Sequence, residues 1–466
     1  MKSIRNQLEA LQIEHNEKYQ KNEIGLAQLF YDLYQDKICF VKERNQWFVY
    51  DGRRWCSDSN ALQVMEYCKD FANELISYAM DKDHREFINV VKRLAERKRR
   101  VFLIKDARSI SPKSFQEFDR NPFLFNCKNG TYNLKTFELQ PHNEKDYITQ
   151  LANVVYDESV ICDRWLSFIE EVTLNDKELG LYIQQMFGYC LTGSTIMECL
   201  FILYGKLSRN GKSTTIETVG NLLGDYFKNV QPETLSKYKR NGSSPTPDLA
   251  RLKGARLVNV PEPEKDLKLN ESLIKQLTGG DTVTGRHLHE DFIEFKPEFK
   301  ILMNTNHLPR VEDETIFASN RIHIIPFDRH FKEEERDNTL KFYFQEESNK
   351  SGILNWMIEG YRQVVLNKMK PTDRMEKLVK SYARKTNVFE LFADECLVTS
   401  IKNRIPLNEL YSIYVTWCLN NGYSYVERKD FKGIVEKDYI VKRNGKRGLE
   451  LVGKTVIELT ESDSSE

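Results

Sequence analysis

Several features that would assign a protein to a special class are missing from this chain of 466 residues. No apolar run approaches the ~20 residues of a membrane-spanning helix, and the N-terminal segment MKSIRNQLEALQIEHNEKYQ lacks the apolar core of a signal peptide. The nine cysteines are scattered without a CxxC pair, so neither a disulfide framework nor a zinc cluster is indicated. These absences favour a soluble protein of a reducing cytoplasm, with no membrane partner.

The chain also has no excess of charge of either sign. Its 69 Lys and Arg residues balance 69 Asp and Glu residues. This balance does not indicate a nucleic-acid-binding protein, but it does not exclude one, because a ring can carry its basic residues inside a central channel. The length predicts about three domains, and the 40% hydrophobic content is typical of a globular protein with an ample core.

The most informative segment is LFILYGKLSRNGKSTTIETV, residues 200–219, in which an apolar, β-prone run leads through a turn into a helical pattern. The turn ends in five residues of the phosphate-binding pattern, Asn210, Gly211, Lys212, Ser213 and Thr214. This strand–loop–helix context predicts a P-loop that binds ATP, in which Lys212 contacts the β- and γ-phosphates and Ser213 ligates Mg²⁺. Five residues separate Gly205 from Gly211, one more than in the usual motif, which leaves the part played by Gly205 open.

Two more apolar strands lead into polar residues. Residues 255–260 precede Pro261-Glu262-Pro263-Glu264, and residues before proline are extended, so Glu262 and Glu264 can face one site. There, at the carboxyl end of a strand, one acid would hold hydrated Mg²⁺ and the other would polarise the attacking water. Residues 300–306 end in Asn306, which can contact the γ-phosphate or orient the water. The alternatives are two solvated loop carboxylates and an Asn that merely ends a strand.

An arginine can complete such a site from a neighbouring subunit. Arg321 opens the apolar segment RIHIIPF and can act in trans as an arginine finger, which supplies positive charge to the transition state. Arg310 is a competing candidate. For either residue, solvation at a strand end is an equally good interpretation.

Other patterns outline the rest of the chain. Turn residues between aromatic or β-prone runs predict hairpins within 47–55 and 125–142, and helical spacing predicts helices within 62–107 and 165–190. Residues 196–327 alternate strands and helices, the pattern of an α/β nucleotide-binding core.

The ordered set of Lys212-Ser213, the PEPE acids, KQLTGGDTVTGRHLHE, KILMNTNHLP and NRIHIIPF resembles the superfamily 3 helicases, especially the poxvirus-type and satellite-phage primase-helicases. The segments NGTYNLKTFELQPH, DRWLSFIEEV and GYCLTGS resemble the helical collar domain of that family. The resemblance covers roughly residues 35–455. The chain departs from the family pattern in its lengthened P-loop and in the lack of a recognisable primase catalytic domain.

The resemblance implies a mixed α/β, AAA+-like P-loop NTPase core with an α-rich N-terminal collar and a C-terminal winged helix. The expected units are 1–115 (helical and hairpin region), 116–195 (collar), 196–335 (motor), 336–387 (helical lid and linker) and 388–466 (winged helix with a disordered acidic tail). It further implies a homo-hexameric ATP-dependent DNA helicase that moves 3′ to 5′ in the replication of a phage or mobile element in a bacterial cytoplasm, with a separate primase or initiator as a further partner. The alternative is an ATP-switched origin-recognition or loading scaffold with little unwinding activity; a DNA-packaging ATPase is a remoter one.

Residues 281–295 lie between the acid-bearing and the Asn-bearing strand, with strand-like alternation on both sides. In related helicases this region forms a hairpin that projects into the channel and grips the DNA backbone. The resemblance therefore names Lys275, Arg286, His287 and His289 as contacts to single-stranded DNA, although the histidines can equally have a packing role.

Residues 401–455 carry eleven Lys or Arg residues against six Asp or Glu residues. Helices followed by a hairpin at Asn444-Gly445 favour a winged helix. The hairpin gathers four basic residues that suit phosphate contacts with duplex DNA, Lys442, Arg443, Lys446 and Arg447. Charges that keep an edge strand soluble would give the same pattern. The basic run 97–100 is interpreted as a solvated helix end.

Overall fold

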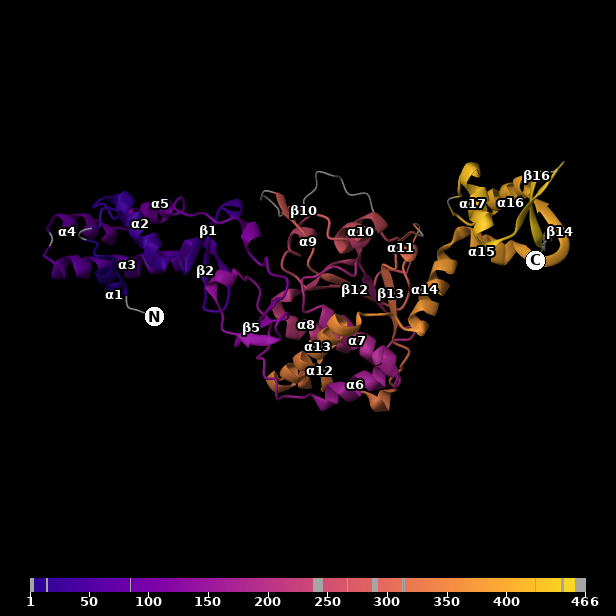
Figure 1. Ribbon diagram of the computed structural model, residues 1–466, viewed down its shortest axis with the longest axis horizontal. Helices are drawn as coiled ribbons and strands as arrows, with labels where there is room; N and C mark the ends of the chain where they lie inside the picture. Colours follow the sequence, from indigo (N-terminus) through magenta and orange to yellow (C-terminus); the bar gives the residue numbers. More distant parts are fainter. Residues whose placement is uncertain are drawn as a thin grey trace, which may run out of the picture.

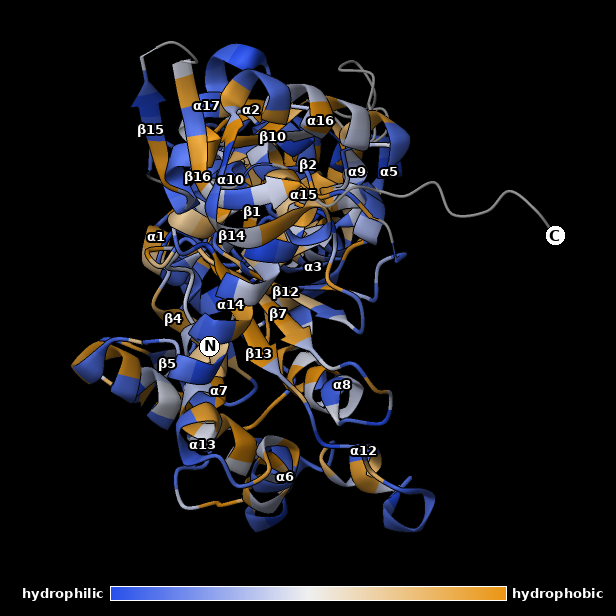
Figure 2. Ribbon diagram, turned by 90° about the vertical axis from the view of Figure 1, so that its right-hand side faces the viewer, coloured by the Kyte–Doolittle hydropathy of each residue, from blue (hydrophilic) through white to orange (hydrophobic). Residues whose placement is uncertain are grey.

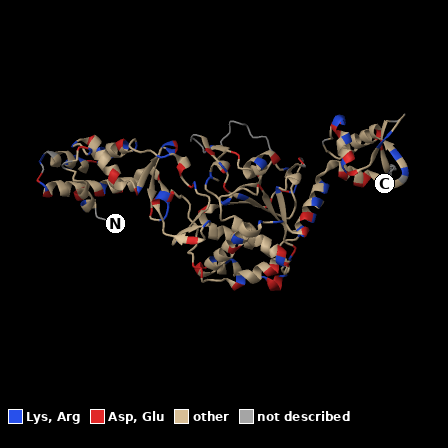
Figure 3. Ribbon diagram, in the orientation of Figure 1, with Lys and Arg blue, Asp and Glu red and all other residues tan. Residues whose placement is uncertain are grey.

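The computed structural model describes residues 4–13, 16–83, 85–237, 246–265, 267–286, 292–311, 313, 315–423, 425–445 and 448–456. The molecule is elongated, with an N-terminal part and a C-terminal part at opposite ends of a central α/β body (Figure 1). Lys and Arg residues and Asp and Glu residues are spread over all three parts, in keeping with the zero net charge (Figure 3). No helix in the described part of the chain has the length and apolar character needed to cross a membrane.

The N-terminal part combines helices with an antiparallel sheet of order β1-β2-β3. Its elements are α1 (Ile4–Leu11), α2 (Glu23–Tyr34), β1 (Ile38–Val41), β2 (Gln46–Tyr50), β3 (Trp55–Asp58), α3 (Leu62–Asp81), α4 (Arg85–Val91) and α5 (Arg97–Ala107). The hairpin predicted within 47–55 is confirmed, since Tyr50 pairs with Trp55 across Asp51-Gly52. The helices share one apolar core, to which α2, α3 and α5 contribute buried residues such as Phe30, Phe71 and Leu103.

A second antiparallel sheet and two helices precede the central sheet. These elements are β4 (Leu124–Cys127), β5 (Gly130–Asn133), β6 (Glu138–Gln140), α6 (Asp163–Thr173) and α7 (Lys177–Tyr189). The strand pairing predicted for 125–142 is confirmed. The helical pattern of 165–190 forms two helices because Leu174 and Asn175 adopt left-handed backbone angles, with φ of 57° and 61°. Asp176 then caps α7 by accepting a hydrogen bond from Leu179 N at 3.1 Å.

The centre of the molecule is a parallel sheet with the strand order β13-β7-β12-β9-β8. Its strands are β7 (Leu200–Tyr204), β8 (Phe227–Asn229), β9 (Leu257–Val260), β12 (Lys300–Thr305) and β13 (Ile322–Pro326). The elements between them are α8 (Lys212–Leu223), α9 (Pro247–Ala250), α10 (Glu271–Thr278), the ribbon β10 (Val283–Arg286) and β11 (Phe292–Phe295), and α11 (Thr315–Ala318). The predicted α/β alternation is therefore confirmed.

Both faces of this sheet are buried, as the continuous apolar strands predict. On one face, residues such as Leu203 and Leu302 pack with α6, α7, α8 and α13 (Glu347–Asn367); on the other, Ile202 and Met303 pack with α10. Figure 2 shows β7 and β13 as hydrophobic strands inside the body. The helices α7 and α13 approach so closely that a Cβ on Gly188 of α7 would lie 2.3 Å from the backbone N of Tyr361 on α13. The predicted collar, motor and lid segments thus share one core.

The C-terminal part has a core of its own. It follows α12 (Leu340–Tyr343), α13 and the connecting helix α14 (Asp373–Thr386). Its elements are α15 (Val388–Cys396), β14 (Leu397–Pro406), α16 (Leu407–Asn420), α17 (Arg428–Asp438), β15 (Val441–Asn444) and β16 (Gly448–Val456), with an antiparallel sheet of order β14-β16-β15. Two helices and a hairpin were expected here; the structure adds α15 and the strand β14.

Candidate nucleotide and DNA sites

The loop after β7 turns into α8 at Gly211, whose φ of 88° lies in the left-handed region. A Cβ at this position would lie 2.5 Å from Val172 Cγ1 and 3.3 Å from Phe168 Cζ, both on α6. Backbone angle and space therefore both require glycine. Val172 and Phe168 of α6 thus lie close to the start of α8. The backbone N–H groups at this helix start have no partner within the helix and can bind an anion.

Gly205 has a packing role at the start of the same loop. A Cβ on Gly205 would lie 2.2 Å from Asn210 Nδ2 and 2.5 Å from the Phe327 carbonyl oxygen. The Asn210 side chain is buried and donates to the Leu207 carbonyl at 2.7 Å, which closes the loop on itself. Gly205 thus makes room for Asn210, and the extra residue of the loop is accommodated by this internal hydrogen bond.

Three polar residues from separate segments, Lys212, Glu262 and Asn306, meet at the carboxyl edge of the sheet. The parallel register places Tyr204 beside Thr305 and Met303 beside Val260, so the loops that follow these strands are neighbours.

The Lys212 ammonium lies 2.6 Å from Asn306 Oδ1 and 3.4 Å from the Gly205 carbonyl oxygen. The Asn306 backbone N–H donates to Glu262 Oε1 at 3.2 Å. Lys212, Asn306 and Glu262 therefore form one connected cluster.

Lys212 is buried, with only 6% of its surface exposed. This is unusual, because a charged ammonium group is rarely buried. Burial lowers its pKa, and the negative charge of Glu262 acts in the opposite direction. A buried ammonium is stabilised by any anion that reaches it. The cluster is thus electrostatically suited to a phosphate group.

The two acids of the PEPE segment are not equivalent in the structure. Both side chains are exposed, but Glu262 reaches the cluster through the backbone of Asn306, whereas Glu264 contributes its carbonyl oxygen to a turn with Leu267 N at 3.1 Å. Within the described stretches, no group of three or more His, Cys, Asp or Glu side chains is arranged to hold a metal. A site completed by phosphate oxygens and water needs fewer protein ligands.

A cleft of about 500 Å³ opens beside the loop, and Ser213 and Thr214 lie in its wall. The opposite wall includes Phe168 of α6, together with Phe331 and Leu340 from the segment after β13. Sequence reasoning assigned no role to these three residues. No local motif marks them, because they reach the cleft through contacts between distant segments: α12 packs on α8, and the Phe331 backbone N–H donates to the Arg209 carbonyl oxygen.

The two arginine-finger candidates lie at different places around the sheet. Arg321 precedes β13, at the amino ends of the strands, because Ile322 pairs with Leu200. Its guanidinium pairs with the Glu198 carboxylate and donates to Thr278 Oγ1 at 2.8 Å. Arg310 is exposed, and its backbone N–H donates to the Leu267 carbonyl. Which of them acts in trans stays a prediction.

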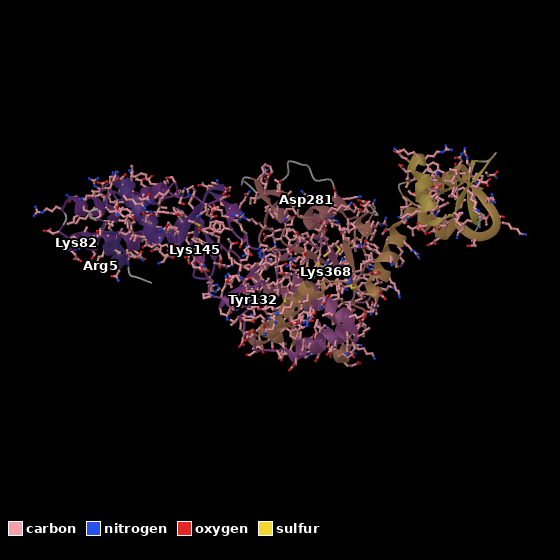
Figure 4. All side chains as sticks on the ribbon, in the orientation of Figure 1. Arg5, Lys82, Tyr132, Lys145, Asp281 and Lys368 are labelled. Carbon is pink, nitrogen blue, oxygen red and sulfur yellow. The ribbon has the colours of Figure 1, made fainter. Side chains whose placement is uncertain are left out.

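The expected hairpin is present as the antiparallel pair β10–β11, which follows Asp281, labelled in Figure 4. Arg286 ends β10, and its guanidinium lies 5.1 Å from the centre of the Phe292 ring on β11. His287 and His289 lie outside the described residues.

Lys275, on α10, is engaged within the chain. Its ammonium lies 2.6 Å from Asp313 Oδ2 and 2.6 Å from Thr315 Oγ1. This pairing lowers the pKa of Asp313 to about 2. Contact of Lys275 with DNA would therefore require the Asp313 ion pair to be given up.

At the final hairpin, Lys442 and Arg443 are exposed on β15. Lys446 and Arg447 are outside the part of the chain that the structure describes.

The fold is a parallel α/β sheet with Lys212, Asn306 and Glu262 together at its carboxyl edge, and comparison with known proteins finds the following similarities. Residues 27–174 match the family model described as D5 N terminal like, and residues 203–322 match a family of unknown function, DUF5906.

Among relatives, the chain is 24% identical over 424 residues to "Putative helicase L207/L206" of Acanthamoeba polyphaga mimivirus, covering 82% of this chain and 44% of the relative. It is 26% identical over 230 residues to "Primase D5" of Fowlpox virus, covering 46% of this chain and 28% of the relative. These matches confirm the resemblance seen in the motifs: the chain is a relative of the poxvirus-type primase-helicases. It spans less than half the length of these relatives.

The fold also occurs in a solved structure of the NrS-1 C-terminal region, with a TM-score of 0.51 at 11% identity. The alignment covers 94% of this chain and 100% of that one.

Proposed function

We propose that this chain is an ATP-driven DNA helicase motor of viral or mobile-element replication. The observation that carries the proposal is the cluster in which the Lys212 ammonium, 2.6 Å from Asn306 Oδ1, meets the Asn306–Glu262 hydrogen bond beside a helix N-terminus. Relatives named helicase or primase support the same class.

In this mechanism the backbone N–H groups of residues 210–214 and the Lys212 ammonium bind the phosphates of ATP. Asn306 contacts the γ-phosphate, and Glu262 orients and polarises the attacking water, with Glu264 as the alternative base. Mg²⁺ would be held by Ser213 and an acid of the PEPE segment, and when bound it neutralises charge on the phosphates. The exposed Ser213 hydroxyl in the cleft wall and the exposed Glu262 carboxylate fit the oxygen ligands that Mg²⁺ prefers.

The assembly in this proposal is a homo-hexamer. Arg321 lies at the sheet edge opposite its own Lys212, so it can act as a finger only in trans, and its guanidinium would have to leave Glu198 and Thr278 to contact a neighbour's phosphate. Its pairing with Glu198 would hold it in place before the neighbour binds ATP. Arg310 is the alternative finger.

DNA contacts are proposed for two regions. The β10–β11 hairpin, with Arg286 at its end, would grip single-stranded DNA in the channel, and translocation would run 3′ to 5′. The element order α15, β14, α16, α17, β15, β16 supports a winged helix, whose strand β15 presents Lys442 and Arg443 to duplex DNA. We retain the expected division into a collar, motor, linker and winged helix as part of this proposal.

The test is ATP hydrolysis with and without single-stranded DNA, together with strand displacement on substrates carrying a 3′ or a 5′ tail. DNA-stimulated hydrolysis and unwinding from the 3′ tail are expected, and Lys212→Ala should abolish both while leaving the melting temperature unchanged. Slow, unstimulated turnover with tight duplex binding would instead identify the ATP-switched scaffold. Normal turnover by Lys212→Ala would refute the ATP site.

A further inference from the structure

The N-terminal part carries a basic surface that none of the sites above uses. Residues 85–108 contain nine Lys or Arg residues against three Asp or Glu residues. Six of these cations are exposed, and four of the six surround the junction of α4 and α5: Lys92, Arg93, Arg97 and Lys98. None of the four has an ion-pair partner among the residues that the structure describes, whereas Arg99 beside them pairs with Glu23.

Helix stability does not account for the charge at the start of α5, although Lys92 and Arg93, at the end of the preceding helical segment, are where cations are favoured. α5 begins with Arg97-Lys98-Arg99-Arg100 and has no acidic residue in its first turn. Cations at the amino end of a helix are repelled by its dipole, and neighbouring like charges repel one another. The one acid at this end is the N-cap Glu96, and among the described residues the structure shows ion pairing only for Arg99, so Arg97 and Lys98 remain exposed cations at the positive end of the helix.

An aromatic ring lies among the cations. Phe102 is 39% exposed, and the Lys98 ammonium is 5.8 Å from the centre of its ring. Phe102 also borders a cavity of about 220 Å³, whose wall combines Arg93 and Arg99 with apolar residues such as Leu26. Proteins bind single strands with two kinds of group: cations that contact the phosphates, and accessible aromatic rings on which bases stack.

We infer that the α5 surface, defined as Lys92, Arg93, Arg97, Lys98 and Phe102, binds single-stranded DNA. The cations contact successive phosphates, and one base stacks on Phe102 at the mouth of the cavity. A duplex fits less well, because its bases are already stacked on one another. Figures 1 and 2 place α5 and β10 toward the same upper side of the molecule, so one strand can run along both. The inference does not depend on ATP binding.

The experiment uses the full chain carrying Arg286→Ala, which removes the proposed channel contact, and a fluorescent oligo(dT) probe titrated at several salt concentrations. In that background Arg97→Ala/Lys98→Ala removes two phosphate contacts. The slope of log K against log salt should become shallower by about 1.4, at about 0.7 per contact. Phe102→Leu should keep the slope and weaken binding about tenfold, since it removes a stacking face but no charge.

The matched control is Lys69→Ala/Lys82→Ala, which removes the same charge from exposed positions on and just after α3; Figure 4 labels Lys82. It should leave affinity and slope unchanged. All variants should keep the melting temperature, and Arg97→Ala/Lys98→Ala with Arg286 intact should keep basal ATP hydrolysis.

An unchanged slope in Arg97→Ala/Lys98→Ala, or an equal loss in the control, would overturn the inference. Tighter binding of duplex DNA or of RNA of equal length would overturn the choice of single-stranded DNA. Full affinity in Phe102→Leu would overturn the stacking contact.

Discussion

The substitution Asn306→Asp tests the central cluster most directly. It changes the acceptor that lies 2.6 Å from the Lys212 ammonium from a neutral amide oxygen to a carboxylate oxygen of nearly the same size. The new ion pair competes with phosphate for Lys212. The Lys212 bond is charge-assisted in both the wild type and the variant, and the added charge–charge attraction is on the order of 1 kcal/mol, which corresponds to about fivefold weaker ATP binding.

The assay is titration with a fluorescent ATP analogue, followed by thermal unfolding of the same samples. Asn306→Asp should lose affinity while its melting temperature stays the same or rises, because Lys212 gains a permanent partner. Asn306→Ala is the control: it frees Lys212 without adding charge, so ATP binding should persist while hydrolysis slows. Wild-type affinity in Asn306→Asp would show that Lys212 does not bind phosphate from this position, and the reasoning would be wrong.

Four further predictions follow from the other residues. Glu262→Gln should bind ATP but hydrolyse it far more slowly, measured by phosphate release, whereas Glu264→Gln should retain most activity; the reverse pattern would exchange their roles. Arg321→Ala should bind ATP yet lose hydrolysis on the order of 10³-fold, and partial activity should return when it is mixed with a variant whose phosphate-binding loop is broken. A wild-type rate of hydrolysis by Arg321→Ala alone would show that Arg321 is not the arginine finger. Arg286→Ala should reduce unwinding of a tailed duplex while basal hydrolysis continues, and full unwinding would give Arg286 a structural role only. Burial lowers the pKa of Lys300 to about 7, whereas the unfolded chain keeps that proton up to about 10.5, so stability should rise with pH across this interval. In urea unfolding between pH 7 and pH 9, the wild type should gain about 2 kcal/mol over Lys300→Met, and parallel pH profiles would contradict the assignment.

Local patterns in the sequence were sufficient for most of the central sheet. Strands β7, β9, β12 and β13 are buried on both faces, and such strands are continuous apolar runs between polar loops, which makes them recognisable one by one. The short strand β8 was not predicted, since its sequence, Phe-Lys-Asn, carries no strand signal and it forms by pairing with β9. Likewise β14 depends on β16 for its hydrogen bonds.

The composition of the nucleotide cluster was predictable only in part. Because the carboxyl ends of parallel strands meet at one edge, polar residues after those strands were expected to lie together, and Glu262 and Asn306 do. The choice between Glu262 and Glu264 was not predictable from the sequence, because the direction of an exposed side chain depends on its neighbours in space. In the structure the backbone N–H of Asn306 donates to Glu262, and which of the two acids acts on the attacking water stays a prediction.

The sequence by itself determined most strands of the central sheet, the loop between β7 and α8 and the glycine at position 211, because each depends on residues close together in the chain. Only the tertiary structure decided that α6 forms a wall of the cleft, that Lys275 is paired with Asp313, and that Arg321 lies at the sheet edge opposite Lys212. These features depend on contacts between segments that are distant in sequence. Such contacts arise from the strand order and from the packing of helices on the sheet, which no local pattern of residues encodes.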